Sequence, residues 1–211
     1  MPAIPEFAFP ILGFFVGSIP FGYVIARTKG IDIRQHGSGN IGATNVLRVV
    51  GKPQGIVCFV LDFLKGWLPV LLAVQAAAAQ NAGSWPAILT ALAAILGHNY
   101  SPWVGFKGGK GVATSAGALL GLYPIALVIG LITWYVVLKT SRYVSVASMT
   151  AAACIPVAVA AQSAITGQWD RVGLGFSLFI GALAILRHRS NIRKLLDGTE
   201  NRLPDKKSPQ A

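Results

Sequence analysis

Polar and basic residues gather in a stretch near the N-terminus whose composition suits an anionic ligand. The stretch reads HGSGNIGATNVLR and runs from His36 to Arg48. Its glycines let backbone N–H groups turn towards a ligand, and the guanidinium at its end offers a forked pair of donors. Four neutral side chains add hydrogen-bonding groups: Ser38, Asn40, Thr44 and Asn45. Because polar groups beside apolar segments need partners, we interpret the stretch as a phosphate site rather than an ordinary glycine-rich loop.

A second stretch, GHNYSPWVGFKGGKGVATS, places Lys107 and Lys110 among closely spaced glycines. This pattern indicates another nest of backbone N–H groups for an anion. It is not a nucleotide-binding P-loop, because Gly111 follows Lys110 where that motif has Ser or Thr. The sequence therefore predicts two anion sites and gives no support to nucleotide hydrolysis.

Two shorter polar stretches follow later in the chain. SRYVS, residues 141–145, has the composition of a short turn between helices, and RHRSNIRK, residues 187–194, joins basic side chains to His188 and Asn191. On a continuing helix these last two residues would share a face, because they are three positions apart. The outer cations of RHRSNIRK have an equally good explanation as a patch for anionic lipids.

The elements that position these stretches are predicted to be membrane helices. The sequence is 54% hydrophobic and 12% charged, with mean hydropathy +0.60, and a typical soluble domain is about 25% charged. Seven apolar segments are expected to be helical, with about 20 residues needed for each crossing: residues 7–26, 54–79, 84–97, 111–122, 124–138, 143–161 and 172–187. The predicted fold class is an all-α, polytopic integral membrane bundle.

The number of complete spans has two interpretations. Seven transmembrane helices is the first, and five spans plus a re-entrant pair around residues 84–122 is the alternative, because several segments are too short for about 30 Å of hydrocarbon. Pro124 predicts either a tight turn or a kink between two of the short segments. One transmembrane domain is expected over residues 1–196, followed by a loosely ordered cytoplasmic tail over residues 197–211.

Basic residues predict the orientation of the chain. All but two of the 18 Lys and Arg residues lie in links that follow alternate segments or in the tail, the exceptions being Lys65 and Arg171. By the positive-inside rule this places the N-terminus outside and the C-terminus in the cytoplasm. The basic residues form no continuous stripe, so nucleic acid is not an expected partner despite the net charge of +11.

Inside the apolar segments, small and ionisable residues predict close packing and an internal ion pair. Gly13 with Gly17, Ser18 with Gly22, and Gly117 with Gly121 have the four-residue spacing that lets helices approach closely. Asp62 and Lys65 lie three residues apart in an apolar run, where charges are costly unless paired. We interpret them as a pair that supports the site rather than as catalytic groups. Cys58 and Cys154 are expected to be buried hydrophobic residues.

Taken together, the polar stretches resemble the bacterial acyl-phosphate-dependent glycerol-3-phosphate acyltransferase family, often called PlsY. The resemblance rests on GSIPFGYVIAR, SGNIGATNVLR, DFLKG, GFKGGKGVATS, SRYVS and HRSNIRKLLDGTENR. It implies transfer of an acyl chain from acyl phosphate to the 1-hydroxyl of glycerol 3-phosphate, giving lysophosphatidic acid and phosphate. It also implies a bacterial inner-membrane protein whose active site faces the cytoplasm and whose partners are these two substrates and membrane lipids.

The resemblance also implies the residues of the site. Six should line it: Ser38, Arg48, Lys107, Ser145, His188 and Asn191. Four more should lie close by: Asn40, Thr44, Asn45 and Lys110. We assign catalysis to Lys107, Ser145 and His188, and expect Arg48 and Lys107 on phosphate groups, with help from the backbone amides of Gly108 and Gly109.

The proton acceptor has no single candidate in the sequence. The His-x4-Asp dyad of other glycerolipid acyltransferases is absent, because Ile41, Trp103 and Arg193 stand five positions after the three histidines. His188 or His98 is one possible acceptor, and an oxygen of the acyl phosphate itself is the one we favour. No cofactor or metal is expected, because there is neither a nucleotide loop nor a carboxylate cluster.

Two other functions are alternatives to acyl transfer. A transporter of phosphate or an organophosphate would also need basic glycine-rich loops, but internal repeats and several polar residues at the membrane midplane are expected there. A CDP-alcohol phosphotransferase would need clustered Asp residues for a metal, whereas Asp62, Asp170, Asp197 and Asp205 are scattered.

Overall fold

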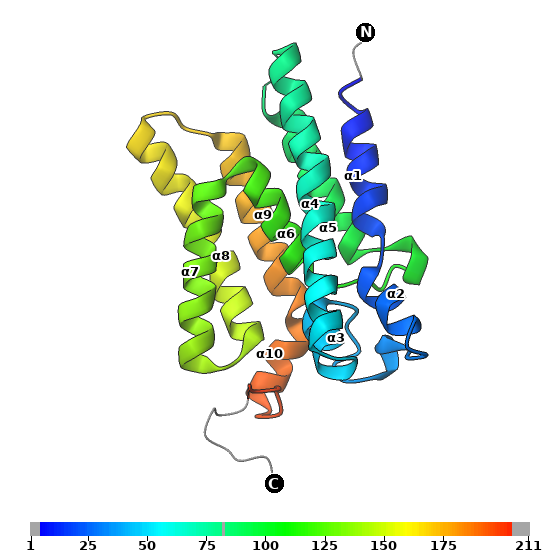
Figure 1. The fold of residues 1–211 in the computed structure, drawn as a ribbon. Helices are drawn as coiled ribbons and strands as arrows, with labels where there is room; N and C mark the ends of the chain where they lie inside the picture. The colour runs from blue at the N-terminus through cyan, green and yellow to red at the C-terminus, as the bar shows by residue number, and fades with distance from the viewer. Residues whose placement is uncertain (1–4, 82, 204–211) are drawn as a thin grey trace. The chain divides into compact units, whose positions relative to one another are not determined.

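The computed structural model describes residues 5–81 and 83–203, and within these ranges the regular structure is helical (Figure 1). The bounds of the helices are α1 Ala8–Ser18, α2 Phe21–Arg27, η1 Ile33–Gln35, α3 Ala43–Val49, α4 Lys52–Gln80, α5 Trp85–Asn99, η2 Pro102–Val104, α6 Val112–Leu122, α7 Pro124–Ser141, α8 Val144–Thr166, α9 Arg171–Arg187 and α10 Arg189–Leu196. Each of the seven predicted apolar segments is helical. The expected all-α class is confirmed.

The chain divides into two compact units, Met1–Pro124 and Ile125–Ala211. In the first unit α4 is the longest helix, with 29 residues, or about 43 Å at 1.5 Å per residue. It packs against α1, α3, α5 and α6, and α1 packs along α5. Figure 1 shows α1 and α4 running side by side.

Small residues bring the helices of the first unit together, as their spacing predicted. A Cβ on Gly13 would lie 2.8 Å from the carbonyl oxygen of Thr90, and one on Gly17 would lie 2.6 Å from the Cα of Ala94. A Cβ on Gly117 would lie 2.9 Å from the backbone N of Trp67. Such contacts leave no room for larger side chains, so α1 meets α5, and α4 meets α6, almost backbone to backbone.

The first apolar segment is broken, and the expectation of one continuous helix over residues 7–26 is wrong. α1 ends at Ser18 and α2 begins at Phe21, with Ile19 at ψ 119° between them. Pro20 explains the break, because proline has no N–H for the helical ladder and disfavours helical geometry in the residue before it. The break leaves the carbonyls of Ser18 and Ile19 available to other partners.

In the second unit, α8 packs against α9 and α10 follows α9. α7 is tied to α8 through the indole Nε1 of Trp134, which donates a 3.2 Å hydrogen bond to the hydroxyl of Ser148. α9 and α10 are bent by 52° at His188. α9 ends at Arg187, where the predicted segment 172–187 also ends, so His188 lies at the bend and Asn191 lies on α10.

Four helical segments among the described residues are long and apolar enough to cross a membrane: Ala8–Arg27, Lys52–Gln80, Pro124–Ser141 and Val144–Thr166. The bent pair α9 and α10 brings the number to five if it counts as one span. α5 and α6 have 15 and 11 residues, or about 22 and 16 Å, which is short of about 30 Å. Seven spans therefore stays a prediction.

The predicted tail, residues 197–211, is described only as far as Leu203, and its remaining residues lie outside the described part. Its described portion contacts the turn before α8, because the N–H of Leu203 donates a 3.0 Å hydrogen bond to the carbonyl of Arg142. One domain over residues 1–196 with a loosely ordered tail stays a prediction.

Candidate active site

In the first unit, Asn45 organises the stretch that precedes α4. Its side chain is buried, and its Oδ1 accepts a 3.0 Å hydrogen bond from the N–H of Ser38. Its Nδ2 lies 3.0 Å from the carbonyl of His36 and 2.9 Å from that of Asn40. These contacts occupy the amide group, so the structure gives Asn45 the role of shaping the loop, whereas the sequence placed it near the substrate.

The other predicted residues of this stretch are turned differently. Ser38, Thr44 and Arg48 are exposed, and Thr44 and Arg48 are four residues apart on α3, so they share a face of that helix. The side chain of Asn40 accepts a 2.8 Å hydrogen bond from the N–H of Gly42, just before α3 begins. A forked cation, a hydroxyl and a shaped loop are thus presented by one segment.

The loop between α2 and α3 contains a local ion pair between Asp32 and Arg34. Both Nε and an Nη of Arg34 donate hydrogen bonds to Asp32, at 2.9 and 2.7 Å. These hydrogen bonds lower the pKa of the Asp32 carboxyl to about 2. The Arg34 guanidinium also lies over the ring of Tyr23, 4.8 Å from its centroid. Arg34 is therefore engaged within the protein.

The second glycine-rich stretch folds back over the end of α5. The N–H of Phe106 donates a 2.8 Å hydrogen bond to the carbonyl of Ser101, and Phe106 has a positive φ of 60°. The N–H of Gly109 donates a 3.1 Å hydrogen bond to the carbonyl of His98. That amide is used inside the protein, in contrast to its predicted role on an anion. Lys107 is exposed, and Lys110 is half-buried.

A shared apolar cluster brings the two glycine-rich stretches together within the first unit. Val104, from the second stretch, is buried in the same cluster as Ile41 and Val46 from the first. Ile33, Ala26 and Cys58 complete the buried part of this cluster. The segment that carries Lys107 therefore packs against the segment that carries Ser38 and Arg48.

In the second unit, Ser145 and Asn191 meet at one carboxylate. The hydroxyl of Ser145 and the Nδ2 of Asn191 each donate a 2.7 Å hydrogen bond to Oε1 of Glu200. Arg142, with φ 66°, forms the turn before α8 that places Ser145 in the first turn of that helix. The short turn predicted for SRYVS is therefore present.

His188 is buried at the bend between α9 and α10. Its Nδ1 lies 2.8 Å from the carbonyl of Ala184. Because a carbonyl oxygen only accepts hydrogen bonds, Nδ1 carries the proton in the neutral ring, and Nε2 is the basic nitrogen. This tautomer suits a proton acceptor at Nε2.

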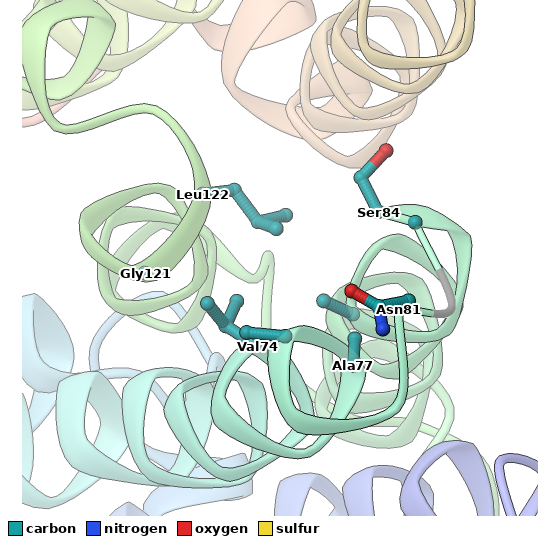
Figure 2. Close-up of a pocket in the computed structure, with 9 residues that line it drawn as sticks. Val74, Ala77, Asn81, Ser84, Gly121 and Leu122 are labelled. Atoms are coloured by element: carbon teal, nitrogen blue, oxygen red, sulfur yellow. The ribbon is translucent and has the colours of Figure 1, made fainter.

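The first unit contains a cavity of about 520 Å³ (Figure 2). Val74, Ala77 and Asn81 line it from α4 and its end, while Gly121 and Leu122 come from the end of α6. The first glycine-rich stretch lies before the N-terminal end of α4, and the second lies before the N-terminal end of α6. The cavity is at the C-terminal ends of both helices. The cavity is mostly apolar, so it lacks the charged groups that phosphate recognition needs.

The sequence indicated no role for Glu200 and only a possible one, as a proton acceptor, for His98. Glu200 stands within the quoted motif HRSNIRKLLDGTENR, and its rarity was a signal, because the chain has only 7 acidic residues. His98 was considered only as a proton acceptor, yet it is 4% exposed and lies beneath Gly109.

The sequence is similar to known proteins along most of its length. Residues 7–198 match the family described as glycerol-3-phosphate acyltransferase. The glycerol-3-phosphate acyltransferase of Aquifex aeolicus is 44% identical over 192 residues, which cover 91% of this chain and 96% of that protein. The one from Geobacter sulfurreducens is 44% identical over 197 residues, covering 93% and 97%.

Two solved structures share the fold. The crystal structure of PlsY (YgiH), an integral membrane glycerol 3-phosphate acyltransferase, in its glycerol 3-phosphate form has a TM-score of 0.85 and 42% identity, and the match covers 94% of this chain and 96% of that one. The lysophosphatidic acid form has a TM-score of 0.82 and 42% identity, covering 94% and 95%. These likenesses agree with the all-α fold and its membrane-length helices, and the chain belongs to the glycerol-3-phosphate acyltransferase family.

Proposed function

We propose that the protein transfers an acyl chain from acyl phosphate to the 1-hydroxyl of glycerol 3-phosphate, releasing lysophosphatidic acid and inorganic phosphate. The observation that carries this proposal is the pair of similar solved structures, whose names give a glycerol 3-phosphate form and a lysophosphatidic acid form. These two molecules are the acceptor and the product of the proposed reaction. No comparable observation favours the transporter alternative.

In the first unit, we assign Arg48 and Lys107 to phosphate groups. Both side chains are exposed, on segments that share the apolar cluster around Val104. Negative charge grows on the departing phosphate and on the oxygen of the tetrahedral intermediate, and cations aimed at these positions stabilise the transition state. Ser38 and Lys110 add further donors, while Gly108 keeps the backbone close to the phosphate.

In the second unit, we assign Ser145, His188 and Asn191 to contacts with the reacting groups. Glu200 orients Ser145 and Asn191 through the two hydrogen bonds that it accepts. The hydroxyl of glycerol 3-phosphate attacks the acyl carbon, the bond between that carbon and the phosphate oxygen breaks, and a phosphate oxygen takes the hydroxyl proton. His188 Nε2 is the alternative acceptor of that proton.

For the membrane, we propose seven spans, with the N-terminus outside and the C-terminus and the active site on the cytoplasmic side of a bacterial inner membrane. The distribution of Lys and Arg supports this orientation. The substrates and the product then meet at the cytoplasmic surface, where the product's acyl chain enters the lipid layer.

The proposed function is tested with purified protein in detergent, glycerol 3-phosphate and one of three donors: acyl phosphate, acyl-CoA or a CDP-activated lipid. Lysophosphatidic acid and phosphate are expected with acyl phosphate alone. Product from acyl-CoA alone would mean that acyl-CoA, and not acyl phosphate, is the donor. Exchange of glycerol 3-phosphate across the membrane of sealed vesicles, without any product, would favour the transporter.

A further inference from the structure

The glycine-rich segment around Lys107 rests on two buried residues at the end of α5, His98 and Asn99. A Cβ on Gly109 would collide with Nε2 of the His98 ring, and one on Gly108 would lie 2.9 Å from the backbone carbon of Asn99. A Cβ on Gly111 would lie 2.8 Å from the side-chain oxygen of Asn99. These close contacts, together with the hydrogen bond from Gly109 to His98, fix where the backbone beside Lys107 runs.

The imidazole of His98 faces α4 on its other side. Its Nδ1 lies 3.7 Å from Oδ1 of Asp62, and the ammonium of Lys65 lies 2.8 Å from the same oxygen. The side chains of Asp62 and Lys65 are 3% and 2% exposed. The imidazole thus lies between a buried carboxylate and the backbone of Gly109.

Lys65 extends these contacts to the break between α1 and α2. Its Nζ donates a 2.6 Å hydrogen bond to the carbonyl of Ile19, which precedes Pro20. The same break holds the start of the second glycine-rich stretch, because the hydroxyl of Ser101 donates a 2.6 Å hydrogen bond to the carbonyl of Ser18. A continuous set of contacts therefore runs from the break through α4 to the segment beside Lys107.

Stability alone gives a weak reason for this buried ion pair. Removing two charges from water is costly, and replacing a buried pair by apolar residues of similar size is often neutral or stabilising. The pair's proximity to His98 offers another reason, because a carboxylate 3.7 Å from one ring nitrogen favours one orientation of a ring that a purely apolar pocket would hold less specifically.

We propose that Asp62, Lys65 and His98 are positioning residues, which hold the backbone of Gly108 and Gly109 so that Lys107 meets its phosphate. None of the three is exposed enough to touch a substrate from solvent, so they act through the glycine-rich segment. The inference rests on the proposed assignment of Lys107 to a phosphate group.

The first test replaces the pair by neutral residues of similar shape and measures stability and kinetics separately. Asp62→Asn and Lys65→Met alone should lower the thermal stability, because each leaves a buried charge unpaired. The double variant should regain most of that stability but keep a KM for a phosphate substrate raised about tenfold, as expected for a weakened charge-assisted contact. A double variant with wild-type stability and a wild-type KM would overturn the proposal.

The second test is a double-mutant cycle between His98→Gln and Lys107→Gln, read by equilibrium binding of glycerol 3-phosphate and by KM for each substrate. If His98 acts through Lys107, His98→Gln weakens the binding of a phosphate substrate about tenfold in the wild-type protein. The same substitution weakens that binding less than about twofold when Lys107 is already replaced. Equal effects in both backgrounds would overturn the proposal. The loss is expected mainly in KM.

Thr90→Val is the matched control. Thr90 is as buried as His98 and also lies on α5, but its hydroxyl donates only to the carbonyl of Pro86 in the same helix. The KM of the Thr90→Val variant for each substrate should stay within about twofold of wild type, because the substitution removes one local hydrogen bond away from Lys107. If Lys107→Gln alone changes the KM for neither substrate, the assignment of Lys107 to a phosphate group fails. The effect of His98→Gln in the two backgrounds tests the positioning role separately.

Discussion

The hydroxyl of Ser145 donates a 2.7 Å hydrogen bond to Oε1 of Glu200, which lies 55 residues further along the chain. The same oxygen accepts from Asn191. One carboxylate thus sets the orientation of two side chains that the family resemblance assigns to the site, and it joins the segment after α10 to the first turn of α8.

Glu200→Ala should lower both stability and activity. Removing the carboxylate leaves the two donors of Ser145 and Asn191 without their acceptor, which is expected to destabilise the protein by about 1–3 kcal/mol. Glu200→Gln keeps an acceptor oxygen and should lose less. Thermal unfolding in detergent and acyltransfer rates measure both effects. Asp197→Ala, an exposed carboxylate in the same segment, is the control, and equal behaviour of Glu200→Ala and this control would contradict the role of Glu200.

Asn45→Asp tests whether Asn45 shapes its loop. The substitution keeps an oxygen for the N–H of Ser38 but places a second oxygen against the carbonyls of His36 and Asn40. We expect a loss of about 1–3 kcal/mol in stability. Urea or thermal unfolding measures it, with the exposed Gln35→Ala as control. If stability is unchanged and only substrate binding is lost, Asn45 contacts the substrate directly.

Arg48→Lys separates a forked phosphate contact from a simple positive charge. Lysine keeps the charge but loses the two parallel donors, so an Arg that grips phosphate is not replaced by Lys. Losing one charge-assisted hydrogen bond should lower kcat/KM by about 10- to 150-fold, with thermal stability near wild type. Arg27→Lys, also exposed and basic, should remain active. A fully active Arg48→Lys enzyme would remove Arg48 from the site.

The orientation is tested by cysteine labelling in intact cells. Cysteines introduced at residues 81 and 168 should react with an impermeant thiol reagent from outside, whereas one at residue 206 should react only after the membrane is opened. The parent protein, with Cys58 buried and Cys154 half-buried, gives the background. Outside labelling at residue 206 alone would reverse the proposed topology.

Local sequence patterns predicted the helices better than the contacts of the polar residues. Apolar runs and four-residue spacing of small residues are properties of short segments, so the helices and the close approaches of Gly13 and Gly17 were predictable. Glu200 meets Ser145 across 55 positions. Sequence spacing does not encode such a pairing, and the same holds for the contact of His98 with Gly109.

One local prediction, a continuous helix over residues 7–26, failed because a single residue changed the geometry of the backbone. Pro20 divides the first span because it lacks an N–H. The last apolar segment ends at residue 187 as predicted, and a bend of 52° follows at His188. The amide of Asn45 satisfies several backbone groups of its own loop, and sequence spacing does not encode those hydrogen bonds either.

The central claim, attack of a hydroxyl on an acyl carbon, is tested most directly by oxygen-18 in the 1-hydroxyl of glycerol 3-phosphate. The purified protein is incubated with this labelled acceptor and unlabelled acyl phosphate, and the products are analysed by mass spectrometry. Because the bond that breaks joins the acyl carbon to the phosphate oxygen, the label should stay in the ester of lysophosphatidic acid, and the released phosphate should carry none. Label in a new phosphate ester, with free fatty acid as the second product, would mean attack at phosphorus and would contradict acyl transfer.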